Sequence, residues 1–128
     1  MNIKYIELKT GYRDDGPAWI GNVKESKSGR TVYFNDHAFR RSNGEGGNYR
    51  DVESGEEYWI SGVKKDGSDR HWAGKGQIVI DRKVVEEYLG MTGRTELDER
   101  RFLVREIEDV FPVERIRAFL NKEVENSK

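Results

Sequence analysis

Glycine-containing turns divide the first eighty residues into short runs in which apolar and polar side chains alternate. The chain has 14 glycines and only two prolines. Glycine accepts the positive φ angles of tight turns without steric cost, so this pattern favours a sheet of short strands over a helical bundle. Short strands joined by glycine-rich turns commonly curl into a small barrel or a strongly twisted sheet. No other feature of the sequence constrains the fold as much.

The alternation predicts where the strands lie. The expected strands are IKYIELKT (3–10), AWIGNVKES (18–26), RTVYFNDHAF (30–39), EEYWISGVKK (56–65) and HWAGKGQIVI (71–80). The KSG between the second and third strands is typical of a hairpin turn. Asp66-Gly67 is a strong hairpin signal, because glycine tolerates the φ that such a turn demands. We therefore expect the last two strands to pair as a hairpin.

Helical spacing begins at Asp81, which we expect to cap a helix that Gly90 ends. GMTGRTEL then has the composition of a linker. The segment DERRFLVREIEDVF (98–111) repeats apolar residues at helical intervals and predicts a second helix. Pro112 suits the first turn of a third helix, since proline is well tolerated there.

These elements predict the α+β class: a small, mostly antiparallel twisted sheet or barrel followed by two or three C-terminal helices. The expected units are a β-rich domain with a closing helix (1–90), a linker (91–97) and an amphipathic helical tail (98–128). The predicted core consists of Ile6, Trp19, Ile20, Val32, Phe34, Tyr58, Ile60, Trp72, Ile78, Ile80, Val85 and Leu89.

Composition limits the function. Charged residues make up 37% of the chain, but the net charge is only −1. Residues 1–83 carry 15 Lys and Arg against 13 Asp and Glu, and residues 84–128 carry 8 against 11. Neither balance is that of a strongly basic nucleic-acid binder. The chain has no cysteine, which excludes disulfides and thiol catalysis, and no apolar leader, so we expect a cytoplasmic protein.

Five segments resemble a group of small bacterial proteins of unknown function. They are YIELKTGY, GPAWIG, SKSGRTVYFN, SGEEYWISGVKKDG and DRHWAGKG, and the resemblance covers about residues 4–90. Some members of that group carry the name deoxyxylulose-phosphate synthase, a thiamine diphosphate enzyme. That name does not suit this chain, which is several times shorter than such enzymes and lacks their acidic glycine motif. The resemblance therefore implies no activity and no catalytic residues.

The stretch DGSDRHWAGKG (66–76) has the densest mixture of acids, bases and aromatic side chains. As a hairpin arm it would point Trp72 inward and His71 and Lys75 outward. Metal binding fails on ligand count, because the chain has only two histidines and neither has a second ligand at suitable spacing. No nucleophile elbow, phosphate loop or dinucleotide motif occurs. We expect no metal, no cofactor and no catalytic residues.

Basic residues flank two expected hairpins and form the tentative binding set. They are Lys24, Lys27, Arg30, Arg40, Arg41, Lys64, Lys65, Arg70, His71 and Lys75. Aromatic residues interleave with them, as in small β domains that stack single-stranded nucleic acid on a basic surface. They are Tyr12, Tyr33, Tyr49, Trp59 and Trp72. Acidic residues intersperse the same segments, however, as on an ordinary solvated surface.

The leading functional hypothesis is a noncatalytic binding or adaptor module that acts through protein–protein contacts. The alternatives are a single-stranded nucleic-acid-binding domain and a small hydrolase that uses His71 as its base. The apolar stripes of the tail require a docking place, because exposed apolar side chains forgo about 1.5–3 kcal/mol each. We expect the tail to pack within its own chain and the protein to be a monomer, with a homodimer through the tail as the alternative.

Overall fold

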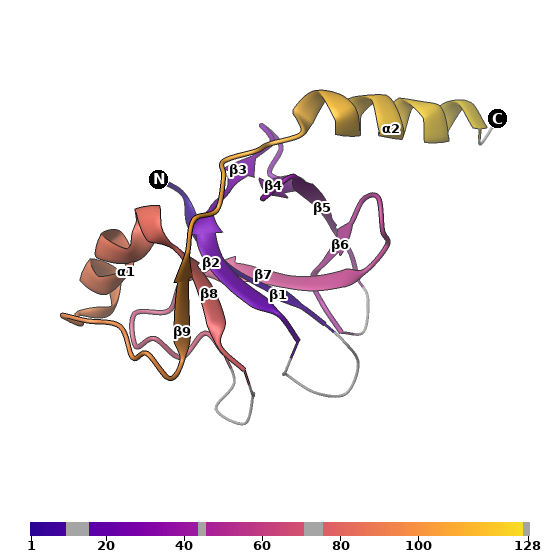
Figure 1. The fold of residues 1–128 in the computed structure, drawn as a ribbon. Helices are drawn as coiled ribbons and strands as arrows, with labels where there is room; N and C mark the ends of the chain where they lie inside the picture. Colours follow the sequence, from indigo (N-terminus) through magenta and orange to yellow (C-terminus); the bar gives the residue numbers. More distant parts are fainter. Residues whose placement is uncertain (10–15, 44–45, 71–75, 127–128) are drawn as a thin grey trace.

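A nine-stranded sheet that curls into an open barrel carries two helices on its outer side (Figure 1). The computed structural model describes residues 1–9, 16–43, 46–70 and 76–126, and the side chains of the last helix as far as Lys122. The elements are β1 (Ile3–Leu8), β2 (Ala18–Asn22), β3 (Lys24–Glu25), β4 (Thr31–Phe34), β5 (His37–Arg41), β6 (Tyr49–Asp51), β7 (Glu57–Gly62), β8 (Ile78–Asp81), the 3-10 turn η1 (Arg82–Val84), α1 (Val85–Thr92), β9 (Phe102–Arg105) and α2 (Val113–Asn126).

The strands lie in the order β3-β4-β5-β6-β7-β1-β2-β8-β9. All neighbours are antiparallel except β2–β8 and β8–β9, which are parallel. The curled sheet confirms the expected α+β class and the twisted sheet or barrel. The expected series of C-terminal helices is matched only in part, because the segment after α1 adds a strand before α2 begins.

The expected pairing of the strands on either side of Asp66-Gly67 is wrong. The turn itself forms, with Gly67 at φ 74° and its N–H donating to the Lys64 carbonyl at 3.0 Å. However, β7 lies between β6 and β1, whereas β8 lies between β2 and β9. The run Ile78–Ile80 explains the difference, because a continuous apolar run is typical of a parallel strand that is covered on both faces.

Residues 30–39, expected as one strand, form the β4–β5 hairpin. Asn35 and Asp36 make its two-residue turn at φ 47° and 65°, and Phe34 pairs with His37. Two successive positive φ angles define the turn whose twist suits a hairpin, and asparagine and aspartate tolerate them better than most residues. The expected β3–β4 hairpin around KSG is confirmed.

The closing helix begins as expected and ends later. The Asp81 carboxylate accepts a hydrogen bond from the Lys83 N–H at the start of η1. The helix continues past Gly90 to Thr92, and Gly93 takes the left-handed conformation at φ 68°. Gly90 keeps a helical geometry, so Gly93 is the residue at which the chain needs glycine.

The helix expected over 98–111 is wrong, because the middle of that segment, Phe102–Arg105, is the edge strand β9. Phe102 packs in the core beside Ile78, its partner across the parallel pair. The apolar residues of RFLVR fit a strand as well as a helix, because so short a run does not distinguish the two periods. Ile107 is also buried, but it belongs to an extended connector between β9 and α2.

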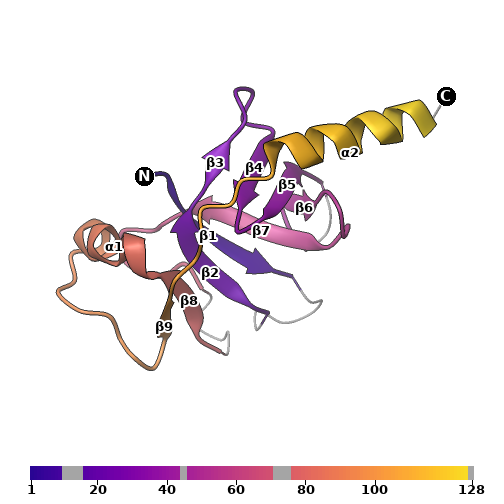
Figure 2. The ribbon, with the colours of Figure 1, turned by 45° about the horizontal axis from the view of Figure 1, so that its top comes forward.

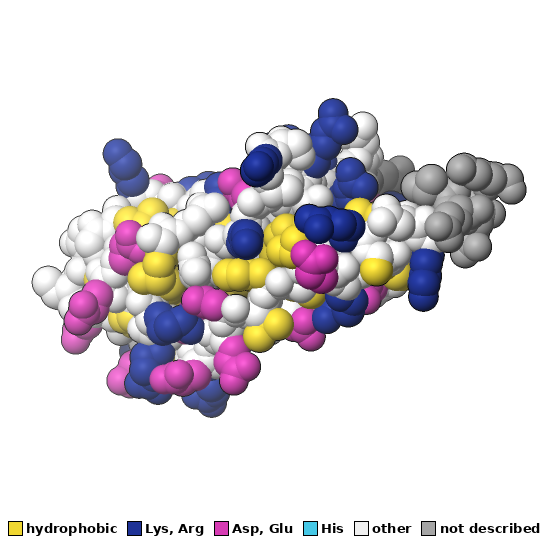
Figure 3. Space-filling model, turned by 90° about the horizontal axis from the view of Figure 1, so that it is seen from above, with side chains coloured by type: hydrophobic (Ala, Val, Ile, Leu, Met, Phe, Trp, Pro, Cys, Tyr) yellow, Lys and Arg dark blue, Asp and Glu magenta, His cyan; other side chains and the backbone are white. Residues whose placement is uncertain are grey.

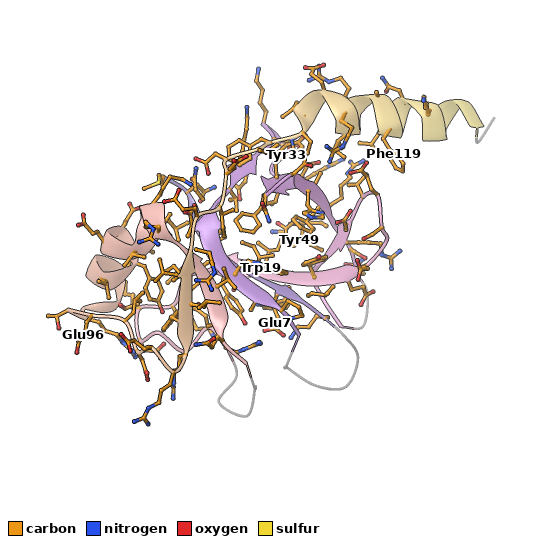
Figure 4. The ribbon with its side chains drawn as sticks, in the orientation of Figure 1. Glu7, Trp19, Tyr33, Tyr49, Glu96 and Phe119 are labelled. Carbon is orange, nitrogen blue, oxygen red and sulfur yellow. The ribbon has the colours of Figure 1, made fainter. Side chains whose placement is uncertain are left out.

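The core has an inner and an outer part. Inside the curl, Ile6, Phe34 and Tyr58 belong to one apolar cluster, and on the outer side α1 packs over Tyr5 and Ile80. Figure 4 shows Trp19 and Tyr49 within the curl. Most of the predicted core is confirmed. The residues that are buried as expected are Ile6, Ile20, Val32, Phe34, Tyr58, Ile60, Ile78 and Ile80.

Other core predictions differ. Trp19, Val85 and Leu89 are only half-buried, and Trp72 lies outside the described residues. On α1 the most deeply buried side chain is Tyr88, whose ring contacts Phe102 with centroids 5.5 Å apart.

The tail docks on its own sheet. The connector runs past β2 and β3 to reach α2, as Figures 1 and 2 both show, and the Asp36 N–H donates to the Val110 carbonyl at 2.8 Å. Ile116 of α2 is 1% exposed and packs with Tyr33 and Ala38 on the outer side of β4–β5. The buried stripe of α2 therefore has its partner in the same chain.

Candidate binding surface

Five of the basic residues singled out in the sequence come together at one end of β3, β4 and β5. Lys24 lies on β3, Lys27 and Arg30 lie around the hairpin turn, and Arg40 and Arg41 end β5. All five side chains are exposed. We call this group the basic end. In the view from above, Lys and Arg side chains stand along the edge formed by the β3–β4 hairpin (Figure 3).

Strand register places positive charges beside one another on both faces of the sheet at the basic end. Arg40 lies directly opposite Thr31 on one side and Arg50 on the other. The Arg41 N–H donates to the Arg30 carbonyl at 3.3 Å. Like charges directly opposite each other in a sheet are destabilising, so this arrangement costs the folded chain some stability.

Within the part of the chain that the structure describes, none of the five cations of the basic end forms an ion pair with a carboxylate. Arg41 instead lies over the ring of Tyr49, 5.7 Å from its centroid. Several cations elsewhere are paired; Arg115, for example, holds both Asp36 and Glu53 within 2.9 Å. The basic end is therefore a cluster of positive charge that the described carboxylates leave uncompensated.

The basic residues around the Asp66-Gly67 turn do not join the basic end. Lys64 and Lys65 are exposed on a separate loop, and His71 and Lys75 lie outside the described residues. The Arg70 side chain is only 8% exposed, lies 3.5 Å from the Glu7 carboxylate and donates to the Gly16 carbonyl at 2.6 Å. Arg70 thus points into the protein and serves its structure.

Glu7 is the centre of a buried polar group on the outer side of β1 (Figure 4). It is 3% exposed, accepts a hydrogen bond from the Tyr5 hydroxyl at 2.5 Å and pairs with Lys9 at 2.8 Å. Burial, followed by the hydrogen bond to Glu7, raises the pKa of Tyr5 far above its usual range. These contacts compensate the Glu7 charge, which makes the group a structural network.

Asp69 lies near this network. Its Oδ1 accepts a hydrogen bond from the Lys64 N–H at 2.8 Å, while its buried Oδ2 has no hydrogen-bond partner among the described residues. Burial raises the pKa of Asp69 above the ordinary value for aspartate. The buried hydroxyl of Tyr88 likewise lacks a partner within the described part of the chain. Asp69 is thus a partly compensated acid whose ionisation opposes folding.

The aromatic residues expected to stack bases do not form a row on the surface. Tyr33 is 8% exposed and packs beneath α2, and Tyr49 is 6% exposed. Tyr12 and Trp72 lie outside the described residues. Trp59 is 41% exposed on the outer face of β7 and donates from Nε1 to the Ser61 hydroxyl at 3.2 Å. In the described part of the chain, Trp59 alone of the five is open to solvent.

The structure also reveals a histidine–aspartate pair that sequence reasoning missed. His37 Nδ1 lies 3.0 Å from Asp51 Oδ2, and Asp51 Oδ1 accepts hydrogen bonds from the N–H groups of Glu53 and Ser54. His37 stands at the mouth of a small pocket of about 30 Å³, whose lining includes Trp19. His37 begins β5 and Asp51 ends β6, 14 positions later, so only the β5–β6 pairing in register would have predicted their contact.

Two other kinds of site are absent from the described residues. No three His, Cys, Asp or Glu side chains there are grouped closely enough to hold a metal ion. Neither described helix has the length and apolar character needed to cross a membrane.

The fold and surface define a small α+β protein with a curled mixed sheet and a basic end. Comparison with known proteins adds no narrower class: no protein-family model matches the chain, no curated protein matches it, and no solved structure matches it.

Proposed function

We propose that the protein is a noncatalytic binding module that acts through protein–protein contacts, with the basic end as its contact surface. The observation that carries this proposal is the uncompensated charge of Arg30, Arg40 and Arg41. Arg40 lies directly opposite Arg50 without a described acid of its own, and an acidic partner would relieve that repulsion. Arginine is also enriched among the residues that dominate protein interfaces.

The surface favours a protein over nucleic acid. Binding of single strands relies on bases stacked on several exposed aromatic rings, and Tyr33 and Tyr49 are buried. Binding to the phosphate backbone alone usually accompanies a strongly basic domain, and this chain has a net charge of −1. Binding to a small acidic patch on a protein requires neither several exposed aromatic rings nor a strongly basic domain.

The test compares single charge reversals on the full chain. Parent protein, Arg40→Glu and the control Arg100→Glu would each be immobilised and exposed to extract of the native cell, once untreated and once treated with nuclease. Arg100 is also exposed, but it lies in the segment before β9. We expect a protein that the parent and Arg100→Glu both retain and that Arg40→Glu loses.

Two results would contradict the proposal. The first is that all three proteins retain the same partners, which would place the contact elsewhere. The second is that retention by the parent disappears when the extract is treated with nuclease, which would favour the nucleic-acid alternative.

A second candidate function rests on His37 and Asp51. A carboxylate on Nδ1 fixes the imidazole and leaves Nε2 as the acceptor, as in sites where histidine is a general base. This pair gives the small-hydrolase alternative a base other than His71. Hydrolysis of generic ester or phosphodiester substrates that is lost in both His37→Ala and Asp51→Asn would favour it, and absence of any turnover by the parent would remove it.

A further inference from the structure

The exposed tryptophan of β7 lies on the same outer face as Arg40 of β5 and Arg50 of β6. We propose that Arg40, Arg50 and Trp59 form one recognition strip for an acidic protein segment that carries an apolar anchor residue. This inference rests on the proposed function, because it names the kind of partner that the basic end would bind.

The register of the strands places the three side chains on one face. Arg50 pairs with Arg40 on β5 and with Glu57 on β7. Trp59 lies two residues beyond Glu57 on the same strand, and side chains two apart in a strand share a face. The opposite face at this point is the inside of the curl, where Tyr58 and Ile60 are buried.

Neither helix contributes to the described core contacts of this part of the sheet. α1 packs over the cluster of Tyr5 and Ile80, and α2 packs over Tyr33 and Ala38. Trp59 between them keeps 41% of its surface exposed. A large, half-exposed indole beside arginines has the composition of an interface centre, where tryptophan and arginine contribute most of the binding energy.

Charge along the strip favours an acidic segment. Arg40 has no described acid partner, whereas Arg50 lies 3.4 Å from Glu57. The Glu57 carboxylate also accepts a hydrogen bond from the Gly46 N–H at 3.0 Å, so its own charge is already compensated. A partner carboxylate would therefore meet net positive charge at Arg40 and Arg50.

The spacing of the strip defines the partner more closely. Neighbouring strands lie about 4.8 Å apart, and residues on one face of a strand recur about every 6.8 Å. Arg40 and Trp59 are two strands and one such repeat apart, which gives about 12 Å between their backbones. An extended peptide places residues i and i+4 on one side about 13 Å apart. The matching pattern is thus Glu-x-Glu-x-apolar, with the two carboxylates toward Arg40 and Arg50.

The probe is a fluorescein-labelled peptide that contains Glu-Ser-Glu-Ser-Leu, titrated with the full chain and followed by fluorescence anisotropy. Two control peptides replace either both glutamates by glutamine or the leucine by serine. The proteins are the parent, Arg40→Ala, Trp59→Ser and Met91→Ser. Met91 is a matched control, since it is 40% exposed and lies on α1.

We expect the parent to bind the Glu-Leu peptide about tenfold more tightly than either control peptide. Trp59→Ser should bind the leucine and serine peptides equally, because the leucine has then lost its contact. Arg40→Ala should weaken binding and reduce its dependence on salt. Met91→Ser should match the parent.

The inference is overturned if the three peptides bind the parent equally, or if none binds more tightly than about 1 mM. It is equally overturned if an oligothymidylate of ten nucleotides binds more tightly than the Glu-Leu peptide. If the peptides fail while Arg40→Glu still loses the cellular partner, the proposed function stands and only the partner's chemistry is wrong. If Arg40→Glu retains that partner, the proposed function itself is wrong.

Discussion

Some charged residues of this chain maintain the fold, whereas others are exposed and available for binding. Arg70 was grouped with the surface cations from its sequence position, yet it lies against Glu7 in the interior. Its neighbours in the sequence, DGSDRHW, give no sign of burial, because the acid that it meets comes from β1, more than sixty residues earlier. Arg40 has the same side chain but lies opposite Thr31 on β4 and Arg50 on β6, neither of which is an acid.

The first prediction concerns Arg70. Arg70→Ala should lower the free energy of unfolding by about 3 kcal/mol, because Glu7 then stays buried with less compensation. Urea denaturation measures the change. The matched control is Arg82→Ala, which removes an exposed pair with Glu106 and should change stability by at most about 1 kcal/mol. Equal stability of the two variants would show that Arg70 does not compensate Glu7.

The second prediction concerns Asp69 and pH. Burial raises the pKa of this acid in the folded chain, so the folded state binds its proton more tightly than the unfolded state does. Its contribution to stability is therefore largest below the unfolded value and is lost as pH rises through the folded pKa. The stability of Asp69→Asn relative to the parent should therefore increase as the pH rises from 4 to 7. Melting temperatures of both proteins at the two pH values test this, and a constant difference would refute it.

Among the elements, the sequence predicted those defined by local signals. The β3–β4 turn, the Asp81 cap and the start of α2 after Pro112 all depend on residues close together in the chain. The parallel placement of β8 and β9 depends on distant segments. The residues RFLVR alone do not predict that Phe102 will pair with Ile78. For the same reason the clustering of Arg40 with Arg50 follows from a β5–β6 pairing that the sequence alone did not predict.

The third prediction concerns the docking of α2. Ile116→Ala should lower stability by about 2–4 kcal/mol, since the side chain is almost fully enclosed by Tyr33 and Ala38. Arg117→Ala on the exposed side of the same helix should change it by no more than about 0.5 kcal/mol. Thermal unfolding followed by circular dichroism compares the two variants. An Ile116→Ala variant that melts like the parent would mean that α2 is not held at this place.

At the scale of the whole molecule, the curled sheet leaves one end basic while the helices and connector carry most of the excess acid. The tail crosses the open side of the curl, where Ile107 enters the core and Arg115 joins the β4–β5 and β6–β7 turns. Ile116 of α2 is buried within its own chain, so this side chain does not need a second chain to cover it.

The fourth prediction is therefore that the full chain is a monomer. Light scattering during gel filtration should give a mass near 14.9 kDa at micromolar concentration. A mass of two chains that falls to one when residues 113–128 are removed would show that α2 docks on a neighbour. Truncation at 112 is the informative choice, because an earlier end would remove β9 and Ile107 from the fold.

We expect the partner to bind at the basic end, and hydrogen exchange on the complex would locate the contact. Backbone amides of the full chain would be followed with and without the protein captured from the native cell. The account predicts slower exchange in residues 24–31, 38–41 and 57–61, and no change in α1. Protection confined to α1 or β9, with residues 24–41 unaffected, would contradict it.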